Sequence, residues 1–397
     1  MNFPSSRCML IACFLLAGFG AHAQQVSRSN PFIQLMDKAT VHARKFGSPV
    51  PVLSPVDQSV LPTTNSKGTL VPVDELHRLG IRVVPWTTND PERMRALIRS
   101  GVDGIISDRP DILHQILREA REKGTQEERE HLEHFDIAAH RGGRGLRPEN
   151  TLPSFESGLD QLSTTLETDT GVSTDHVSTI WHDQFYNPES CRHADGTSYM
   201  KENRVYLRDI SSTDAQKIFV CDKVHFGPDQ KNDLSLSPVA VAFATKEGLQ
   251  NPYVPTYVDQ LFRFVRFYAE YYRIGPGKSI PHAVERANNA ENVRFNIETK
   301  ILPELKSTSK ESALAPSAAV QYQNHTVGPE LFVSTLAGTI ERYHMEARSE
   351  IQSFDFRTLL LTEQQHPKIP TYYLTGDPAS LSTGLVPESL RVDVSKP

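Results

Sequence analysis

Residues 166–172 read LETDTGV, and this stretch sets the frame in which the rest of the chain can be placed. It predicts a β-strand on which Glu167 and Asp169, two positions apart, leave the same face. On a solvated edge strand such a pair needs no partner. Inside a closed sheet, two buried carboxylates are costly unless a cation or another partner compensates them. The stretch therefore indicates either an exposed edge or a strand whose acidic face chelates a hard cation.

Strand patterns recur on both sides of this stretch and alternate with helical patterns. Eight candidate strands are found: near Val52, near Val83, and over 136–139, 166–172, 178–181, 293–297, 351–354 and 371–374. Eight strands alternating with helices is the count of a closed (β/α)8 barrel, the TIM barrel. We therefore expect an α/β fold of this class, with helices near 32–46 and 154–162 and one charged helix over 111–133.

The interval 191–290 breaks this alternation, because it is polar, dotted with prolines and rich in Tyr and Phe. So long an interval between two barrel strands usually indicates a lobe over the mouth of the site. We expect it to be inserted between strands 3 and 4. Cys191 and Cys221 fall within it. In an oxidising compartment they can form a disulfide, and two separate thiols are the alternative.

The first residues resemble a targeting signal rather than part of a fold. Arg7 precedes the apolar run 9–19, and residues 21–23 form an A-x-A cleavage site. We expect a signal peptide over 1–23 and an exported protein, periplasmic or secreted. Lipid modification at Cys13 is the alternative.

The composition and charge of the chain exclude some classes of binding partner. The formal net charge is −6 and no long basic run is present, which excludes a nucleic-acid backbone as the main partner. No stretch after the signal reaches about 18 uninterrupted apolar residues, so stable membrane insertion is not expected. The sequence predicts no particular oligomeric state.

A glycine-rich turn follows the strand at 136–139. It places His140 beside Arg141, whose guanidinium can bind phosphate oxygens in a bidentate manner; an ordinary surface turn is the alternative. Glu149 is placed to face back toward the strand end. Asn150 or Thr151 can cap the helix that follows, and capping is the role we expect for Asn150.

Two other strand ends carry polar groups. His182 closes the strand at 178–181, where barrel enzymes place catalytic groups, and together with His140 it offers one imidazole to accept a proton and one to donate it. Glu298 and Lys300 repeat the two-residue spacing on another strand. Trp86, at the end of the strand near Val83, is either core packing or an apolar wall for a glycerol backbone.

These motifs, in this order and spacing, resemble the glycerophosphodiester phosphodiesterase family over residues 135–376. They are His140-Arg141-Gly142, Pro148-Glu149-Asn150-Thr151, Glu167-Thr168-Asp169, His182-Asp183 and Glu298-Thr299-Lys300.

The resemblance implies hydrolysis of glycerophosphodiesters to glycerol 3-phosphate and an alcohol. It also implies one Ca²⁺ or Mg²⁺ held by Glu167, Asp169 and Glu298, phosphate contacts from Arg141 and Lys300, and acid and base roles for His140 and His182. Which imidazole is the acid, and whether water or a neighbouring hydroxyl attacks, stay open.

The N-terminal part resembles the end of the same family. Residues 79–90 and 101–110 are similar to its last strand, helix and closing turn. We therefore expect a circular permutation, in which segment 24–134 supplies strands 7–8 and the last helix, and 135–397 supplies strands 1–6. A remnant of a tandem duplication is the alternative; it would leave a six-strand barrel with two unpaired edges.

Two rival functions remain. A related barrel phospholipase would attack intact lipid head groups, although no basic amphipathic helix for membrane docking is evident. A catalytically silent barrel would only bind a phosphorylated ligand.

Overall fold

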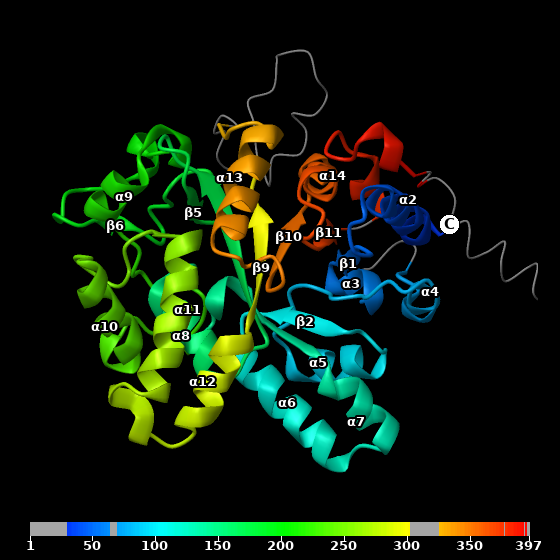
Figure 1. Cartoon of the computed structure of the whole chain (residues 1–397), viewed down its shortest axis with the longest axis horizontal. Coiled ribbons are helices and arrows are strands. Elements are labelled where there is room, and N and C mark those ends of the chain that lie inside the picture. Colours follow the sequence, from blue (N-terminus) through cyan, green and yellow to red (C-terminus); the bar gives the residue numbers. More distant parts are fainter. Residues whose placement is uncertain (1–29, 64–69, 302–324, 377, 393, 395–397) are drawn as a thin grey trace, which may run out of the picture.

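The structure is a computed structural model that describes residues 30–63, 70–301, 325–376, 378–392 and 394. The expected signal peptide, 1–23, lies outside the described residues. Figure 1 shows a curled sheet with helices around its outside. No helix among the described residues combines the length and the apolarity needed to cross a membrane.

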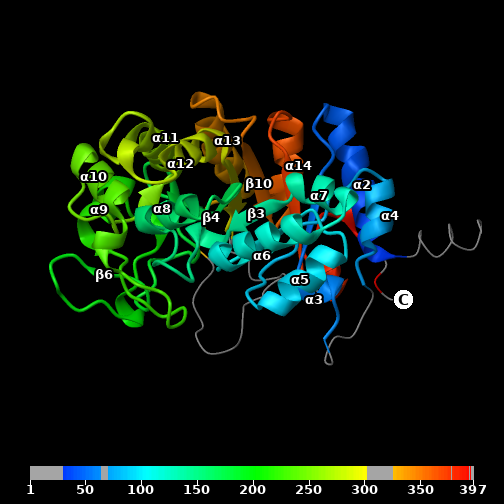
Figure 2. The same cartoon turned by 90° about the horizontal axis from the view of Figure 1, so that it is seen from below.

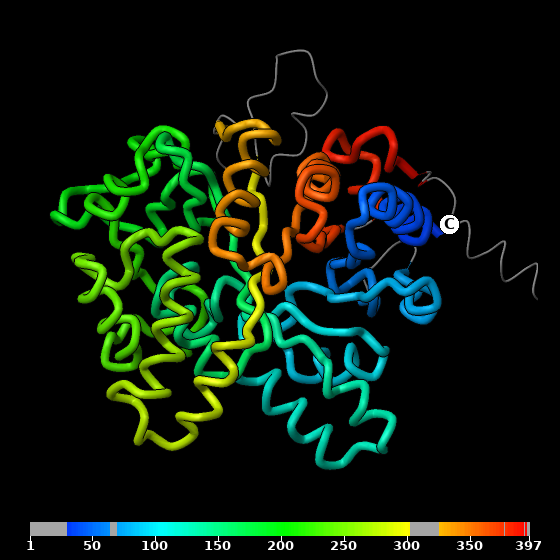
Figure 3. The backbone as a smooth tube through the Cα atoms, in the orientation of Figure 1, coloured from blue at the N-terminus to red at the C-terminus, as the bar shows by residue number. Residues whose placement is uncertain are grey.

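Seven strands lie side by side, each parallel to its neighbours. In spatial order they are β1 (Val52–Pro55), β11 (Thr371–Thr375), β10 (Ser349–Ser353), β9 (Arg294–Thr299), β4 (Thr165–Val172), β3 (Asp136–Ala139) and β2 (Gly104–Ser107). Strand β1, from the first part of the chain, and strand β11, from the last part, are therefore neighbours. Figure 3 shows the path of the backbone, coloured from blue at the N-terminus to red at the C-terminus.

An eighth extended segment, residues 82–88, closes the ring between β1 and β2. On one side Val84 N donates to Leu53 O (3.0 Å) and Trp86 N to Pro55 O (3.0 Å). On the other side Ile106 N donates to Pro85 O at 2.9 Å. Side chains from five of the eight strands meet inside the ring: Val52, Val84, Ile106, Ala138 and Tyr372. The expected (β/α)8 barrel is confirmed.

The membership of the ring differs from the sequence prediction in one place. The predicted strand 178–181 forms β5 (Ser178–Ile180), which is antiparallel to β4 and to β8 (Thr256–Tyr257) and stands outside the ring. The ring contains β2 instead, which is only four residues long and which the sequence prediction did not count as a strand. The N-terminal segment therefore supplies three ring strands, β1, 82–88 and β2, rather than two. Circular permutation itself stays a prediction.

Helices surround the ring. The longer ones are α2 (Pro31–Phe46), α5 (Pro91–Arg99), α6 (Pro110–Lys123), α8 (Leu152–Asp160), α10 (Pro238–Glu247), α11 (Val258–Arg273), α12 (Ala283–Asn292), α13 (Pro329–Arg342) and α14 (Phe356–Gln365). Shorter ones are α3 (Asp57–Val60), α4 (Val73–Arg78), α7 (Gln126–Glu133) and α9 (Ser212–Ile218).

Helix α2 shows why these segments are helical. Phe32, Leu35, Met36, Ala39 and Ala43 recur on one face and are buried. The Asn30 side chain caps the first turn, and Gly47 ends the helix with a φ of 75°, which glycine adopts without strain. Figures 1 and 2 both show α2 beside α14, so the first described helix packs against the last.

The single helix expected over 111–133 is wrong. Gly124 ends α6, and Thr125 begins α7 with a capping box in which its hydroxyl accepts from Glu128 N and the Glu128 side chain accepts from Thr125 N. A cap in the middle of a charged run therefore divides one helical pattern into two helices.

The interval 191–290 has two parts. Its first part contains a short two-stranded antiparallel sheet, β6 (Arg192–His193) with β7 (Phe219–Val220), and the disulfide Cys191–Cys221, which settles the choice left open by the sequence. Its second part, α11 and α12, packs against α8 as part of the helical layer. Whether the first part is an insertion between strands 3 and 4 stays a prediction.

Candidate active site

The predicted chemical residues gather at the carboxyl ends of the ring strands. A cavity of about 230 Å³ lies there. Its lining includes seven of the residues singled out by the sequence: Trp86, His140, Arg141, Glu167, His182, Glu298 and Lys300. Two others, Asp169 and Glu149, lie behind it and contact Arg141.

Three carboxylates form the floor of the site. Asp169 on β4 is paired in register with Glu298 on β9, and Glu167 lies two residues earlier on β4. One oxygen from each of the three lies within 4.8 Å of the other two, and all three side chains are buried. The same-face argument for Glu167 and Asp169 is therefore correct, and the third acid comes from the neighbouring strand.

The three acids are buried close together, and this shifts the pKa of each of them. Burial, then the charges of Asp169 and Glu298, raise the pKa of Glu167 well above its ordinary value. Burial likewise raises the pKa of Glu298 to about 7, against the opposing effect of Lys300. Burial would also raise the pKa of Asp169, but Arg141 and Lys300 outweigh it and hold that pKa below its usual range.

Arg141 is held by the turn that follows β3. Its φ is 51°, a left-handed conformation that non-glycine residues rarely adopt. In this position its backbone N–H donates to Glu167 at 2.8 Å, while its guanidinium pairs with Glu149 (2.7 Å) and Asp169 (3.1 Å). The strained turn thus directs both the main chain and the side chain of Arg141 at the acidic cluster.

Lys300 follows β9 directly and lies on the other side of the acids. Its Nζ is 2.7 Å from Glu298 and 3.3 Å from Asp169. Burial would lower its pKa, but these two carboxylates raise it, so the ammonium stays charged. Arg141 and Lys300 thus approach Asp169 from two different strands.

Both imidazoles are oriented by carboxylates. His140 Nδ1 lies 2.6 Å from Asp108, and His182 Nδ1 lies 2.8 Å from Asp183. This leaves the Nε2 atom of His140 on the side of the acids, 3.9 Å from Glu167. Burial lowers the pKa of His140 to about 4 and also lowers that of His182, so the neutral form dominates at pH 7. Each ring can therefore accept a proton.

Trp86 forms part of the cavity wall. Its indole N–H donates to Ser54 O at 3.0 Å, and its ring meets Phe354 edge to face at 5.3 Å. Both of these aromatic side chains line the cavity and are only partly buried. Trp86 therefore presents an apolar surface at the mouth of the barrel.

Sequence reasoning missed three supporting residues. Asp108, at the end of β2, joins His140 to Arg144, whose Nε donates to the same oxygen at 2.7 Å. Gln352 on β10 donates to Glu167 at 2.7 Å. Asp108 stands at a strand end, which is a signal that the sequence offered, whereas nothing in the sequence singles out Gln352.

The role expected for Asn150 is wrong. Thr151 caps α8, and Asn150 instead has a φ of 57° and points its side chain into the site. Its amide donates to Asp169 at 2.9 Å and accepts from Thr168 at 2.9 Å. Asn150 therefore orients one of the three acids.

The acidic cluster fits a divalent cation of the hard type. Glu167, Asp169 and Glu298 offer only oxygen atoms, which Ca²⁺ and Mg²⁺ prefer. The Oδ1 atom of Asp169 is buried and accepts no hydrogen bond from the described residues; its one ion-pair partner among them is Lys300 Nζ, at 3.3 Å. A buried oxygen of this kind, next to two acids with raised pKa values, is what a cation would satisfy.

Known proteins were compared with the chain. It is 33% identical over 127 residues to glycerophosphodiester phosphodiesterase domain-containing protein 4 of Macaca fascicularis, which is 32% of this chain and 19% of that protein. A phosphodiesterase of Oleispira antarctica, in complex with the product sn-glycerol-3-phosphate, is 15% identical with a TM-score of 0.34 over 59% of this chain and 64% of its own.

A glycerophosphodiester phosphodiesterase of Agrobacterium tumefaciens is 11% identical with a TM-score of 0.32, over 59% of this chain and 64% of its own. The matches thus cover less than two thirds of each of these three proteins.

The broadest match is to a family model. Residues 18–112 and 140–394 match the model of the glycerophosphoryl diester phosphodiesterase family, and together they make up most of the chain. The chain therefore belongs to the glycerophosphoryl diester phosphodiesterase family.

Proposed function

We propose that this protein hydrolyses glycerophosphodiesters to glycerol 3-phosphate and an alcohol. The observation that carries the proposal is the convergence, around one cavity, of an acidic cluster, two imidazoles and two cationic side chains. Membership of the family supports the same reaction. A barrel that merely binds phosphate would need the cations but neither of the carboxylate-oriented imidazoles.

The proposal includes a divalent cation, Ca²⁺ or Mg²⁺, held by Glu167, Asp169 and Glu298. When bound, it would neutralise charge on the phosphoryl oxygens of the substrate. The fit of the three buried acids to such an ion supports this assignment.

Arg141 and Lys300 are assigned to the phosphate. Both line the cavity, so each can stabilise charge that develops on the phosphoryl oxygens. Glu149 keeps the Arg141 side chain in place through its 2.7 Å contact. Trp86, as the apolar wall, would contact the glycerol backbone.

His140 and His182 are assigned to proton transfer. One imidazole, in its neutral form, takes a proton from the nucleophile, which is water or a neighbouring hydroxyl; the other must first take up a proton, which it then gives to the departing alkoxide. The carboxylates at their Nδ1 atoms fix the tautomer and turn the Nε2 atoms to the substrate.

The test is replacement of each imidazole. In His140→Asn and His182→Asn, turnover of glycerophosphocholine, followed by ³¹P NMR, should fall on the order of 10²- to 10⁴-fold. The matched control is His366→Asn, because His366 Nδ1 also contacts a carboxylate, Glu341 at 2.8 Å, but does not line the cavity. Turnover close to wild type in either site variant would remove that residue from the mechanism.

Export to the periplasm or medium is also proposed, from the residue pattern of 1–23. Fractionation of the source cell, with sequencing of the mature N-terminus, tests it. An uncleaved chain found only in the cytoplasm would contradict the proposal.

Circular permutation is proposed because β1, 82–88 and β2 seal the ring between β11 and β3. Deletion of residues 24–134 tests it, and the shortened chain should not fold. A deletion product that folds and hydrolyses substrate would eliminate this idea in favour of a duplication remnant.

A further inference from the structure

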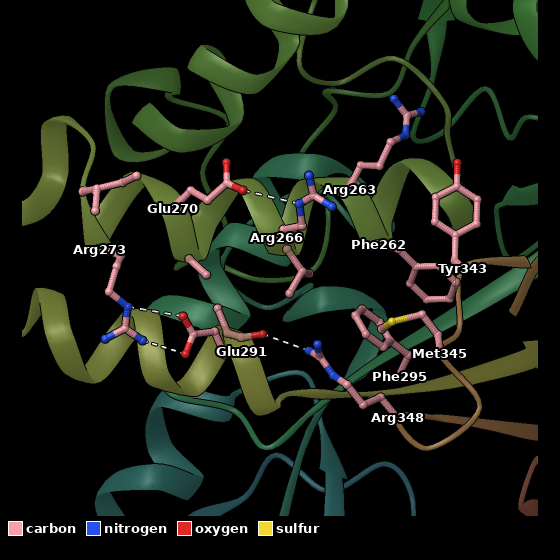
Figure 4. Close-up of a pocket in the computed structure, with 14 residues that line it drawn as sticks. Phe262, Arg263, Arg266, Glu270, Arg273, Glu291, Phe295, Tyr343, Met345 and Arg348 are labelled. Atoms are coloured by element: carbon pink, nitrogen blue, oxygen red, sulfur yellow. Dashed lines mark hydrogen bonds and ion pairs between the residues drawn. The ribbon is translucent and has the colours of Figure 1, made fainter. Parts of the chain in front are cut away.

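A second cavity lies on the outer side of the barrel, away from the candidate active site. It has a volume of about 380 Å³, within the usual range of ligand pockets. Figure 4 shows it between α11, α12 and the segment that leads into β10. Phe295, which lines it, is near the start of β9, whereas Glu298 of the active-site cluster is near the end of that strand. The two cavities therefore lie toward opposite ends of the barrel.

The floor of this cavity is apolar. Phe262, Ala269 and Phe295 belong to the main core and are each at most 6% exposed. Phe262 meets Phe295 edge to face at 4.9 Å, and Met345 lies beside them. Because these side chains are packed in the core, the floor is a rigid apolar surface rather than a patch of loose apolar side chains.

Four arginines form the rim, and three of them have acidic partners. Arg263 pairs with Glu247, Arg266 with Glu270, and Arg273 with Glu291. These three pairs lie near or at the surface. In each of them a carboxylate already offsets the charge of the arginine, and water screens what remains, so these arginines attract an incoming anion only weakly.

Arg348 differs from the other three. Its Nε and one terminal nitrogen donate to the carbonyl oxygens of Val293 and Ala290, at 2.7 to 2.9 Å, and no ion pair joins it to a carboxylate among the described residues. Its guanidinium lies 5.5 Å from the centre of the Phe295 ring. Burial lowers the pKa of Arg348, against a weaker opposing effect of Glu291. A positive charge thus stands, incompletely compensated, directly on the apolar floor.

We propose that this cavity binds a single-chain amphiphile with an anionic head group, with the chain against Phe262 and Met345 and the head group on Arg348. A polar anion alone would leave the apolar lining of the cavity without an apolar partner, and a neutral apolar molecule would bury the guanidinium without a counter-charge. An amphiphile satisfies both parts. A fatty-acid carboxylate and a lysophospholipid phosphate share this chemistry.

The experiment is calorimetric titration of the full chain with dodecanoate, with dodecanoyl lysophosphatidylglycerol and with dodecyltrimethylammonium, each below its critical micelle concentration. Dodecanoate or the lysolipid should bind, and the cationic amphiphile should not. Binding of dodecanoate alone identifies a free fatty acid as the source, and tighter binding of the lysolipid identifies a lipid. Failure of both anions to bind, or equal binding of the cation, overturns the proposal.

Variants locate the binding. Arg348→Gln should weaken binding on the order of tenfold or more, because it removes the charge that meets the head group. Arg348→Lys should keep part of the affinity, because the positive charge remains. Ala269→Phe should abolish binding, because the larger side chain fills the cavity. The matched control is Arg266→Gln, since the Arg266 side chain is 84% exposed and already paired, so its loss should change affinity little.

Circular dichroism shows whether each variant is folded. Unchanged affinity in folded Arg348→Gln and Ala269→Phe would place the amphiphile elsewhere and overturn the proposal. Hydrolysis of glycerophosphocholine is measured in parallel and should be unaffected, so the outcome is independent of the function proposed for the other cavity.

Discussion

Both ends of the barrel bury acidic side chains, and they differ in how those acids are compensated. At the amino-terminal end, Arg294 lies 2.9 Å from Asp136 and 3.2 Å from Glu350. Arg82 is close enough that the charges of Glu350 and Asp136 help to raise its pKa, against the lowering effect of burial. Two arginines therefore face two acids, so the charges match in number, while burial still raises the pKa of Glu350 against the opposing effect of both arginines.

At the carboxyl-terminal end the balance fails. Arg141 and Lys300 face the three clustered acids, and Glu149 is a fourth carboxylate on Arg141. The difference separates a structural plug, whose charges match in number, from the acidic cluster, to which we propose that a cation binds.

The first test is removal of the cation that we propose for the carboxyl-terminal end. Chelation should reduce turnover on the order of 10²- to 10³-fold, because several kcal/mol of charge stabilisation is lost. Re-addition of Ca²⁺ or Mg²⁺ should restore it. The measurement is glycerophosphocholine hydrolysis before chelation, after it and after add-back. Full activity after rigorous chelation would refute a metal site at the acidic cluster.

The next effect concerns the amino-terminal end. Arg294→Met leaves Asp136 and Glu350 without their shared partner, so the free energy of unfolding should fall by about 3–5 kcal/mol. Urea unfolding followed by circular dichroism measures it. The control is Arg273→Met, which removes an exposed pair with Glu291 and should cost at most about 1 kcal/mol. Equal losses in the two variants would mean that the plug is not a buried network.

The smallest effect tests the imbalance itself. The pKa of Glu298 is about 7 in the folded protein, above its ordinary 4.5, so wild type loses stability as pH rises through this window. Glu298→Gln lacks this loss. In the absence of metal, the free energy of unfolding of the variant minus that of wild type should therefore be roughly 1–3 kcal/mol larger at pH 8 than at pH 5.

Urea unfolding in chelator at the two pH values measures this difference. The lowered pKa values of His140 and His182 act in the opposite sense, with stability lost as pH falls below 6.5, but they are common to both proteins. A difference that is the same at both pH values would show that the pKa of Glu298 is not raised in the folded protein.

The sequence predicted the class of fold and most of the site, because both depend on local patterns. The two-residue spacing of Glu167 and Asp169 follows from strand geometry, and the structure places them as expected. The ring membership of β5 and β2 was predicted wrongly, because alternation of apolar residues does not tell a parallel ring strand from an antiparallel hairpin.

Residues whose role depends on distant neighbours were harder to predict. Asp108 orients His140 from a strand 32 positions away, and Gln352 contacts Glu167 from 185 positions away. Asn150 looked like a cap because it precedes a helix, but its left-handed backbone turns the side chain to Asp169. Such contacts exist only once the ring is closed.

The pairing of β1 with β11, in which Val52 lies opposite Tyr372, has a consequence for biosynthesis. Strand β1 emerges from the ribosome long before its partner, because 320 positions separate Val52 from Tyr372. Until then its backbone groups lack a partner on that side. Contacts between such distant residues also slow folding. The barrel therefore cannot close before β11 has emerged from the ribosome.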